Sequence, residues 1–233
     1  MLPASGNEGG MRVGEPPLAR RLAAEGIGSF FLFAAVIGSG IMGERLAGGN
    51  VAIALLANTL ATGAILFVLI AMLGPISGAH LNPAVSLVSA SRRELQWPDA
   101  AAYVAAQLTF GILGVWAANL MFDLPLLQLS GKARPGPGQL LGESIATFGL
   151  IFTILGTIRH RQQSVPASVA LYIAGAYWFT SSTSFANPAI TVARSLSDTF
   201  AGIAPQHVPW FILAQLIGAA LAAWVAKGVF PAA

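Results

Sequence analysis

The sequence contains no cysteine and few charged residues. Without cysteine, the chain can form neither disulfides nor thiolate metal sites, and it has no cysteine nucleophile. Charged residues make up 9% of the 233 residues and apolar residues 55%, whereas a soluble domain is about one quarter charged. Such a chain cannot cover its surface with groups that water solvates. The composition therefore predicts a membrane protein with no room for a separate soluble domain.

Other features are also missing. The net charge is only +3 and the basic residues are scattered along the chain, which argues against a nucleic-acid partner. Residues 1–17 lack the apolar core of a signal peptide, so we expect a disordered tail. His160 and His207 lie at the ends of apolar stretches without the spacing of metal ligands. No metal or cofactor is therefore expected.

Apolar stretches of helix length dominate the rest of the chain. A bilayer span needs about 20 mostly apolar residues, and six stretches qualify: residues 18–42, 51–73, 99–121, 139–158, 165–181 and 208–229. Two further apolar stretches, residues 81–90 and 186–196, are too short to span. These two are expected to be half-helices that enter the membrane and turn back. The expected fold class is an all-α polytopic membrane protein.

Three landmarks recur in the same order in the two halves of the chain. Glu25 corresponds to Glu143, Asn82-Pro83-Ala84 to Asn187-Pro188-Ala189, and Gln107 to Gln215. Since each half has three spans, an odd number, the second copy must enter the membrane from the opposite side. We expect a first inverted repeat over residues 18–121, a connecting loop over 122–138 and a second repeat over 139–233.

The distribution of basic residues predicts the orientation. Eight lie on one side of the predicted spans and three on the other, which places both termini in the cytoplasm. The eight are Arg12, Arg20, Arg21, Arg92, Arg93, Arg159, Arg161 and Lys227, and the three are Arg45, Lys132 and Arg134.

The repeated Asn-Pro-Ala sequence is typical of a helix start. Asn can cap the helix, and Pro at the first helical position lacks only an N–H that would have no partner there. One copy would fit many soluble helices. Two copies at matching points of an inverted repeat predict two half-helices whose N-termini meet near the membrane midplane.

These segments, Ser77-Gly-Ala-His-Leu-Asn-Pro-Ala-Val85 and Phe185-Ala-Asn-Pro-Ala189, resemble those of the major intrinsic proteins, or aquaporins. The resemblance covers nearly the whole chain from Leu18 to Val229. It implies six tilted helices and two half-helices that abut at the pore centre. It also implies a homotetramer with one pore per subunit, embedded in membrane lipid, with small neutral solutes as its cargo.

The electrostatics of the expected pore centre can be stated independently of the resemblance. Each helix N-terminus carries about half a positive charge, so two facing one constriction repel cations and hydronium. If the amides of Asn82 and Asn187 donate to a passing oxygen, that oxygen cannot relay a proton onward. Neutral hydroxylated solutes would still pass.

Several polar residues lie inside or beside the predicted spans. Glu25 and Glu143 are candidates for function because a buried intramembrane charge is costly; the resemblance implies that they accept hydrogen bonds from the backbone before each half-helix, and proton relay is the alternative. Gln107 and Gln215 are expected to bond other helices. The resemblance implies that His80 lines the cytoplasmic half of the pore, with a packing role as the alternative.

Selectivity in this family is set at an outer constriction. By the family's spacing, its positions fall on Thr62, Gly175, Ser184 and Ile190, where Ile190 replaces the usual arginine. Water-specific relatives have Phe and His at the first two positions, so Thr62 and Gly175 predict a wider opening. Arg194, one turn beyond Ile190, is expected to reach the constriction. The alternative is that Arg194 anchors a loop or pairs with Asp198.

The run from Asn187 to Phe200 is most similar to aquaglyceroporin-like bacterial aquaporins of arsenic-resistance operons. That similarity implies uncharged metalloid species, such as arsenous acid or methylated arsenicals, as cargo, and a bacterial inner membrane as the location. A strict water channel is one alternative. An ion-coupled transporter with inverted repeats is another, although both glutamates lie within full spans. An enzyme is not expected, because no catalytic grouping is apparent.

Overall fold

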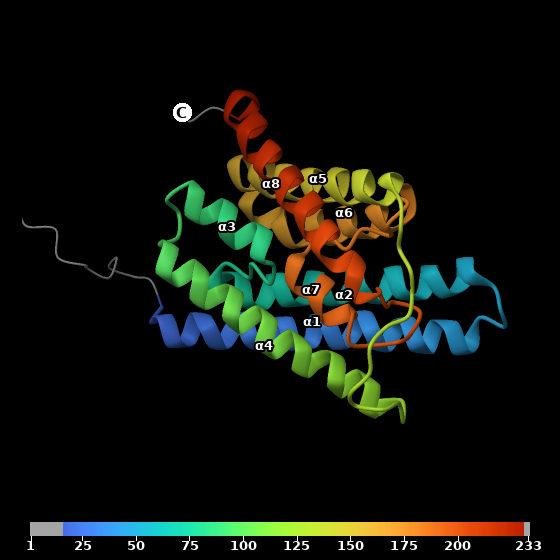
Figure 1. Ribbon diagram of the computed structural model, residues 1–233. Coiled ribbons are helices and arrows are strands. Elements are labelled where there is room, and N and C mark those ends of the chain that lie inside the picture. The colour runs from blue at the N-terminus through green and yellow to red at the C-terminus, as the bar shows by residue number, and fades with distance from the viewer. Residues whose placement is uncertain (1–15, 231–233) are drawn as a thin grey trace, which may run out of the picture.

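The computed structural model describes residues 16–230, and the described chain is built from helices (Figure 1). The tail expected over residues 1–17 lies almost wholly outside this range. The long helices are α1 (Leu18–Leu46), α2 (Val51–Ser77), α4 (Trp97–Met121), α5 (Pro137–Arg161), α6 (Val165–Phe179) and α8 (Val208–Val229). The short elements are α3 (Pro83–Ser91), α7 (Pro188–Arg194) and the 3-10 turns η1 (Gln162–Ser164) and η2 (Pro205–His207).

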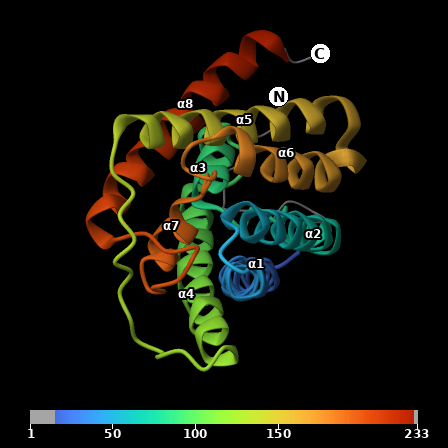
Figure 2. The same cartoon turned by 90° about the vertical axis from the view of Figure 1, so that its right-hand side faces the viewer.

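The helices form two groups with the short helices between them. Helix α1 packs against α2 and α4 in the first half, and α5 packs against α6 and α8 in the second, while α2 and α6 join the halves. Helices α3 and α7 each contact α4 and α8, and they meet each other at the centre (Figures 1 and 2). This is the expected arrangement of an inverted repeat with two re-entrant half-helices.

The described chain has five segments that are long and apolar enough to cross a membrane. One of them, residues 137–179, contains both α5 and α6, which lie side by side. The five segments therefore hold the six long helices that the sequence predicts. Helix α6 has 15 residues, which corresponds to only about 22 Å, and the chain then enters the second re-entrant segment.

The half-helices begin later than predicted. Helix α3 starts at Pro83 and α7 at Pro188, because Asn82 and Asn187 cap the two helices through their side-chain oxygens. The residue just before each asparagine, Leu81 and Ala186, has a positive φ and is not helical. Apolar character alone did not reveal these boundaries.

Glycines let the helices of each half cross closely. A Cβ at Gly114 of α4 would lie 2.2 Å from the Phe30 carbonyl oxygen of α1, and one at Gly218 of α8 would lie 2.2 Å from the Ser144 carbonyl oxygen of α5. Small residues at such crossings allow helix backbones to approach in a membrane. The outer faces carry exposed apolar residues such as Leu60, Leu171 and Trp224, as a lipid-facing surface requires.

Candidate functional site: a pore between the two repeats

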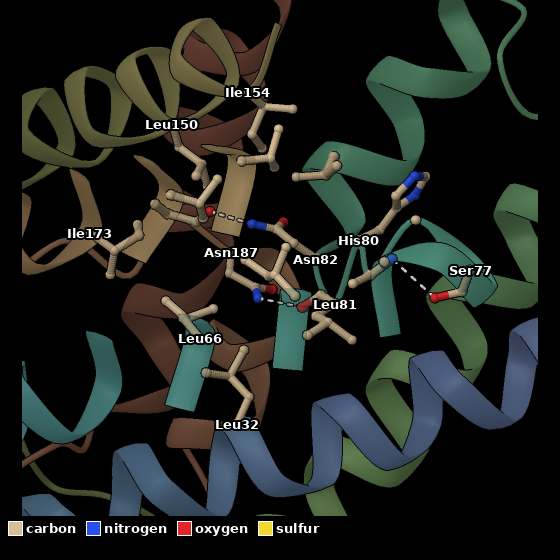
Figure 3. Close-up of a pocket in the computed structure, with 18 of the residues that line it drawn as sticks. Leu32, Leu66, Ser77, His80, Leu81, Asn82, Leu150, Ile154, Ile173 and Asn187 are labelled. Carbon is tan, nitrogen blue, oxygen red and sulfur yellow. Dashed lines mark hydrogen bonds between the residues drawn. The ribbon is translucent and has the colours of Figure 1, made fainter. Parts of the chain in front are cut away.

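A cavity of about 500 Å³ runs between the two halves of the molecule. At one end it reaches Arg21, Glu94 and Tyr103, close to the first described residues, and at the other it reaches Thr62 and Arg194. Apolar side chains from α1, α2, α5 and α6 form one wall, and the two asparagines face it from the centre (Figure 3). The labelled apolar residues of this wall are Leu32, Leu66, Leu150, Ile154 and Ile173.

Asn82 and Asn187 are held by reciprocal bonds between the two repeats. The Asn82 amide nitrogen donates to the Ala186 carbonyl oxygen over 2.7 Å, and the Asn187 amide nitrogen donates to the Leu81 carbonyl oxygen over 2.8 Å (Figure 3). Each side-chain oxygen caps its own half-helix. Because an amide has two N–H donors, one on each asparagine remains for the cavity that both residues line. Pro83, Ala84, Pro188 and Ala189 form the buried first turns behind them.

Glu25 of α1 is fully buried beneath the first re-entrant segment. Its carboxylate accepts from the backbone N–H groups of His80 and Leu81 over 2.9 and 2.7 Å, and from the Ser77 hydroxyl over 2.7 Å. The Gln107 amide of α4 also donates to it over 2.8 Å. The carboxylate therefore accepts hydrogen bonds from backbone N–H groups that have no partner within a helix.

Glu143 of α5 makes the matching contacts in the second half. It is fully buried and accepts from the backbone N–H groups of Phe185 and Ala186 over 2.8 and 2.9 Å. The Gln215 amide of α8 donates to it over 2.6 Å. Gln107 and Gln215 thus join their helices to the glutamates, and each also bonds a half-helix hydroxyl.

His80 lies on the same side of the centre as Tyr103. Its ring nitrogen Nδ1 is 3.1 Å from the Ser86 hydroxyl, and its ring stands edge-on to Tyr103 with centroids 5.4 Å apart. Both residues line the cavity. The sequence allowed either a pore-lining or a packing role for His80. In the structure its ring packs against Tyr103 and also lines the cavity.

Four of the five residues expected at the outer constriction line the cavity. Thr62, Ser184, Ile190 and Arg194 are all buried, and they come from α2, the segment before α7, and α7 itself. The Ser184 hydroxyl has no hydrogen-bond partner within residues 16–230. Ser184 thus lines the cavity, but its hydroxyl oxygen is itself buried.

Gly175 does not belong to this constriction. It is exposed on α6, it is not among the cavity-lining residues, and a Cβ added to it would meet nothing within 4 Å. Tyr177 lines the cavity instead, with its hydroxyl 3.3 Å from the Thr62 hydroxyl. Residues two apart on a helix point about 200° apart, so an error of two in the counted spacing selects the opposite face. No sequence signal distinguished Tyr177.

Arg194 is nearly fully buried at 2% exposure and turns back toward the segment before its helix. Its guanidinium carbon lies 3.4 Å from the centre of the Phe185 ring, and its Nε donates to the Ala201 carbonyl oxygen. Asp198, the alternative partner, instead accepts from the Gly131 backbone N–H over 2.9 Å. Phe185 also lines the cavity; it belongs to the Phe-Ala-Asn-Pro-Ala motif, but the sequence indicated no role for its ring.

Comparison with known proteins agrees with this geometry. The family model described as "Major intrinsic protein" matches residues 13–181, well over half of the chain. The chain belongs to the major intrinsic protein family. It is therefore a multi-pass membrane channel for small neutral solutes and not an enzyme.

Relatives and solved structures of the family extend the match across the second repeat. Aquaglyceroporin AqpS of Rhizobium meliloti (strain 1021) is 54% identical over 218 residues, covering 92% of this chain and 93% of the relative. Nodulin-26 of Glycine max is 30% identical and covers 90% and 77%. The X-ray structure of the aquaglyceroporin from Plasmodium falciparum has a TM-score of 0.70 and 19% identity, covers 92% of this chain and 98% of that one, and shows the shared fold.

Proposed function

We propose that the channel passes water, glycerol and larger uncharged hydroxylated species, including metalloid hydroxides such as arsenous acid and methylated arsenicals, and that it excludes protons and ions. The observation that carries this proposal is the outer constriction: the hydroxyl-bearing residues Thr62, Tyr177 and Ser184 line a cavity in which Ile190 stands where the family usually has arginine. The name of the aquaglyceroporin relative supports glycerol. The metalloid cargo rests on the subgroup resemblance.

The constriction has the chemistry that a polyol or a metalloid hydroxide needs. Hydroxyl groups both donate and accept hydrogen bonds, so a solute with several hydroxyls can exchange its water shell for them. The Arg194 guanidinium adds donors, and Ile190 adds an apolar surface at which water gains little. This combination favours solutes that have both hydroxyls and weakly hydrated atoms.

Ion exclusion follows from the centre of the pore. The N-termini of α3 and α7 meet there, and their partial positive charges oppose cations. The remaining N–H of Asn82 and of Asn187 would donate to a passing oxygen and orient its lone pairs toward both amides. A proton relay needs an acceptor at that point, and the amides offer none to the solute.

In this proposal the two glutamates have a structural role: they hold the re-entrant segments in place. Each carboxylate oxygen of Glu25 and Glu143 accepts at least one hydrogen bond from the protein. With the N–H groups of the re-entrant segments turned to these carboxylates, the carbonyl groups of the same segments remain for other partners, and those of Leu81 and Ala186 accept from the two asparagines. A relay would require the carboxylates to release those bonds.

The remaining expectations complete the proposal. We place the channel in a bacterial inner membrane with both termini in the cytoplasm, in contact with lipid and assembled as a homotetramer. The repeats are taken as residues 18–121 and 139–233, with the loop over 122–138 on the outer side.

The proposal is tested by stopped-flow light scattering of proteoliposomes that are challenged in turn with water, glycerol and arsenous acid gradients. We expect all three to equilibrate faster than in empty liposomes, and an imposed proton or sodium gradient to leave the rates unchanged. Water flux without glycerol flux would identify a strict water channel. A requirement for a proton or sodium gradient would identify a transporter.

A further inference from the structure

Arg134, in the loop between the two repeats, is buried although the sequence suggested only a charge on the outer surface. Its exposure is 7%, while its neighbours at 133 and 135 are exposed. Burial lowers the pKa of Arg134 to about 10, so the side chain stays charged at neutral pH. A buried charge persists only where specific partners hold it, which directs attention to what Arg134 contacts.

Arg134 ties together three segments that are far apart in the sequence. Its Nε donates to the Gly202 carbonyl oxygen over 2.8 Å, and its Nη1 donates to the Ser182 carbonyl oxygen over 3.1 Å. Its guanidinium carbon lies 4.7 Å from the centre of the Phe185 ring. The loop passes beside the turn that follows α7 in both views (Figures 1 and 2). One side chain thus joins the loop, the segment before α7 and the turn after it.

The same ring and the same turn hold Arg194. The Arg194 guanidinium stacks on Phe185, and its Nε donates to Ala201, whose carbonyl directly precedes that of Gly202. Two guanidinium groups therefore share one aromatic ring and two consecutive carbonyl groups. Arg194 lines the cavity, whereas Arg134 is not among the lining residues of the described chain. Any effect of Arg134 on solutes must pass through its neighbours.

We propose that Arg134 is a positioning residue of the outer constriction, which fixes Phe185 and the 201–202 turn and thereby holds the Arg194 guanidinium in the pore. This inference rests on the proposed function, in which Arg194 meets the solute. It explains how an arginine four residues beyond the position of Ile190 can act there: the side chain must turn back, and the loop supplies the clamp that keeps it turned. The connecting loop is then part of the selectivity apparatus.

The test compares Arg134→Lys, which keeps the charge but loses the fork of donors, with Arg134→Gln, which loses both. The matched control is Arg45→Gln, because exposed Arg45 also donates to a carbonyl, that of Phe122, and lies over a phenylalanine ring, but at the outer end of α1. The readout is the ratio of glycerol to water permeability in proteoliposomes of equal protein content. The same substitutions are repeated in an Arg194→Ala background.

We expect both Arg134 variants to change the ratio by about threefold or more, and Arg45→Gln to leave it at the parent value. In the Arg194→Ala background, the Arg134 substitutions should add no further change, because the group they position is gone. A ratio that stays at the parent value in folded Arg134 variants would overturn the inference. So would an equal shift with and without Arg194, or an unaltered ratio in Arg194→Ala itself.

Failure of both Arg134 variants to enter the membrane, with Arg45→Gln inserted normally, would assign Arg134 to folding and also overturn the inference. The proposed function fails separately, if the parent protein passes no glycerol. A parent that conducts glycerol and responds to Arg194→Ala but not to Arg134 substitution would keep the proposed function and reject only the positioning role.

Discussion

The two repeats treat their re-entrant segments alike but differ in what they place beside the pore. In the first repeat Glu25 and Gln107 hold the segment before α3, and in the second Glu143 and Gln215 hold the segment before α7. Beyond this shared support, the first repeat contributes His80 at the end near the N-terminus. At the other end the first repeat contributes Thr62 of α2, and the second contributes Tyr177, Ser184, Phe185 and Arg194.

This difference separates two requirements: hydrogen-bond partners for the buried non-helical backbone, and selectivity among solutes. A buried non-helical segment in a membrane needs partners for its backbone donors wherever it occurs, so both repeats need the carboxylate and the amide. Selectivity is needed at only one point along a pore, so the polar constriction lies at one end, where the second repeat supplies most of the side chains and the first supplies Thr62. We therefore expect substitutions in the shared support to affect folding in both halves, and substitutions at the constriction to affect solute choice alone.

The largest effect is expected from the glutamates. Glu143→Leu leaves two buried backbone N–H groups unpaired at a cost of about 1–3 kcal/mol each, and Glu25→Leu should cost more because Glu25 also accepts from Ser77. We expect little folded protein from either variant by size-exclusion chromatography. Glu143→Gln, which retains an acceptor, should keep most of the flux. A well-folded Glu143→Gln protein without flux would instead support a proton relay.

Next in size is the effect of a charge at the pore centre, where the halves meet. Asn187→Asp loses the donor to the Leu81 carbonyl and places a negative charge beside two helix N-termini. Glycerol flux should fall by roughly three- to tenfold, as for one lost hydrogen bond, and a cation current should appear in planar bilayers. Asn50→Asp is the control, because Asn50 caps α2 in the same way at an exposed site. Parent-like flux without current in Asn187→Asp would contradict the central position of Asn187.

A smaller and more selective effect is expected at the constriction. Thr62→Phe adds a ring that a packed wall cannot compress, so glycerol and arsenous acid permeability should fall by several-fold while water permeability changes less. Gly175→His is the matched control: Gly175 is exposed on α6 and should tolerate the new side chain without a change in flux. A lowered glycerol-to-water ratio in Gly175→His would show that the constriction has been assigned to the wrong face of α6, and an unchanged ratio in Thr62→Phe would show that Thr62 of α2 does not form it.

The smallest effect concerns Lys132 in the loop between the two repeats. Partial burial lowers the pKa of Lys132 to about 8, with repulsion from Arg134 and Arg194 adding to it. Between pH 8 and the ordinary lysine pKa of about 10.4, the unfolded chain binds more protons than the folded one, so this group makes stability rise with pH. The melting temperature of the parent should rise slightly more from pH 7 to 9.5 than that of Lys132→Met. Identical slopes would show that this shift is absent.

The sequence alone determined most of the fold. Low charge, apolar stretches of span length and the repeated landmarks predicted six long helices and two half-helices, and the comparisons confirmed the family. These features are local: a bilayer span has a fixed length, and an Asn-Pro pair starts a helix wherever it stands. The site residues at or next to these motifs, from His80 and Asn82 to Ser184, Asn187 and Ile190, fall in the cavity for the same reason.

Only the tertiary structure decided what stands around the outer constriction. Counting residues back from Asn187 crosses the non-helical stretch between α6 and α7, so it could not tell whether Gly175 or Tyr177 faces inward. Arg134 presents the same difficulty, because a loop arginine reads as an exposed charge until Ser182 and Gly202 are seen to accept its hydrogen bonds. Helix periodicity fixes faces within one helix. Which side chains meet across loops depends on how separate segments pack, and no spacing in the sequence contains that information.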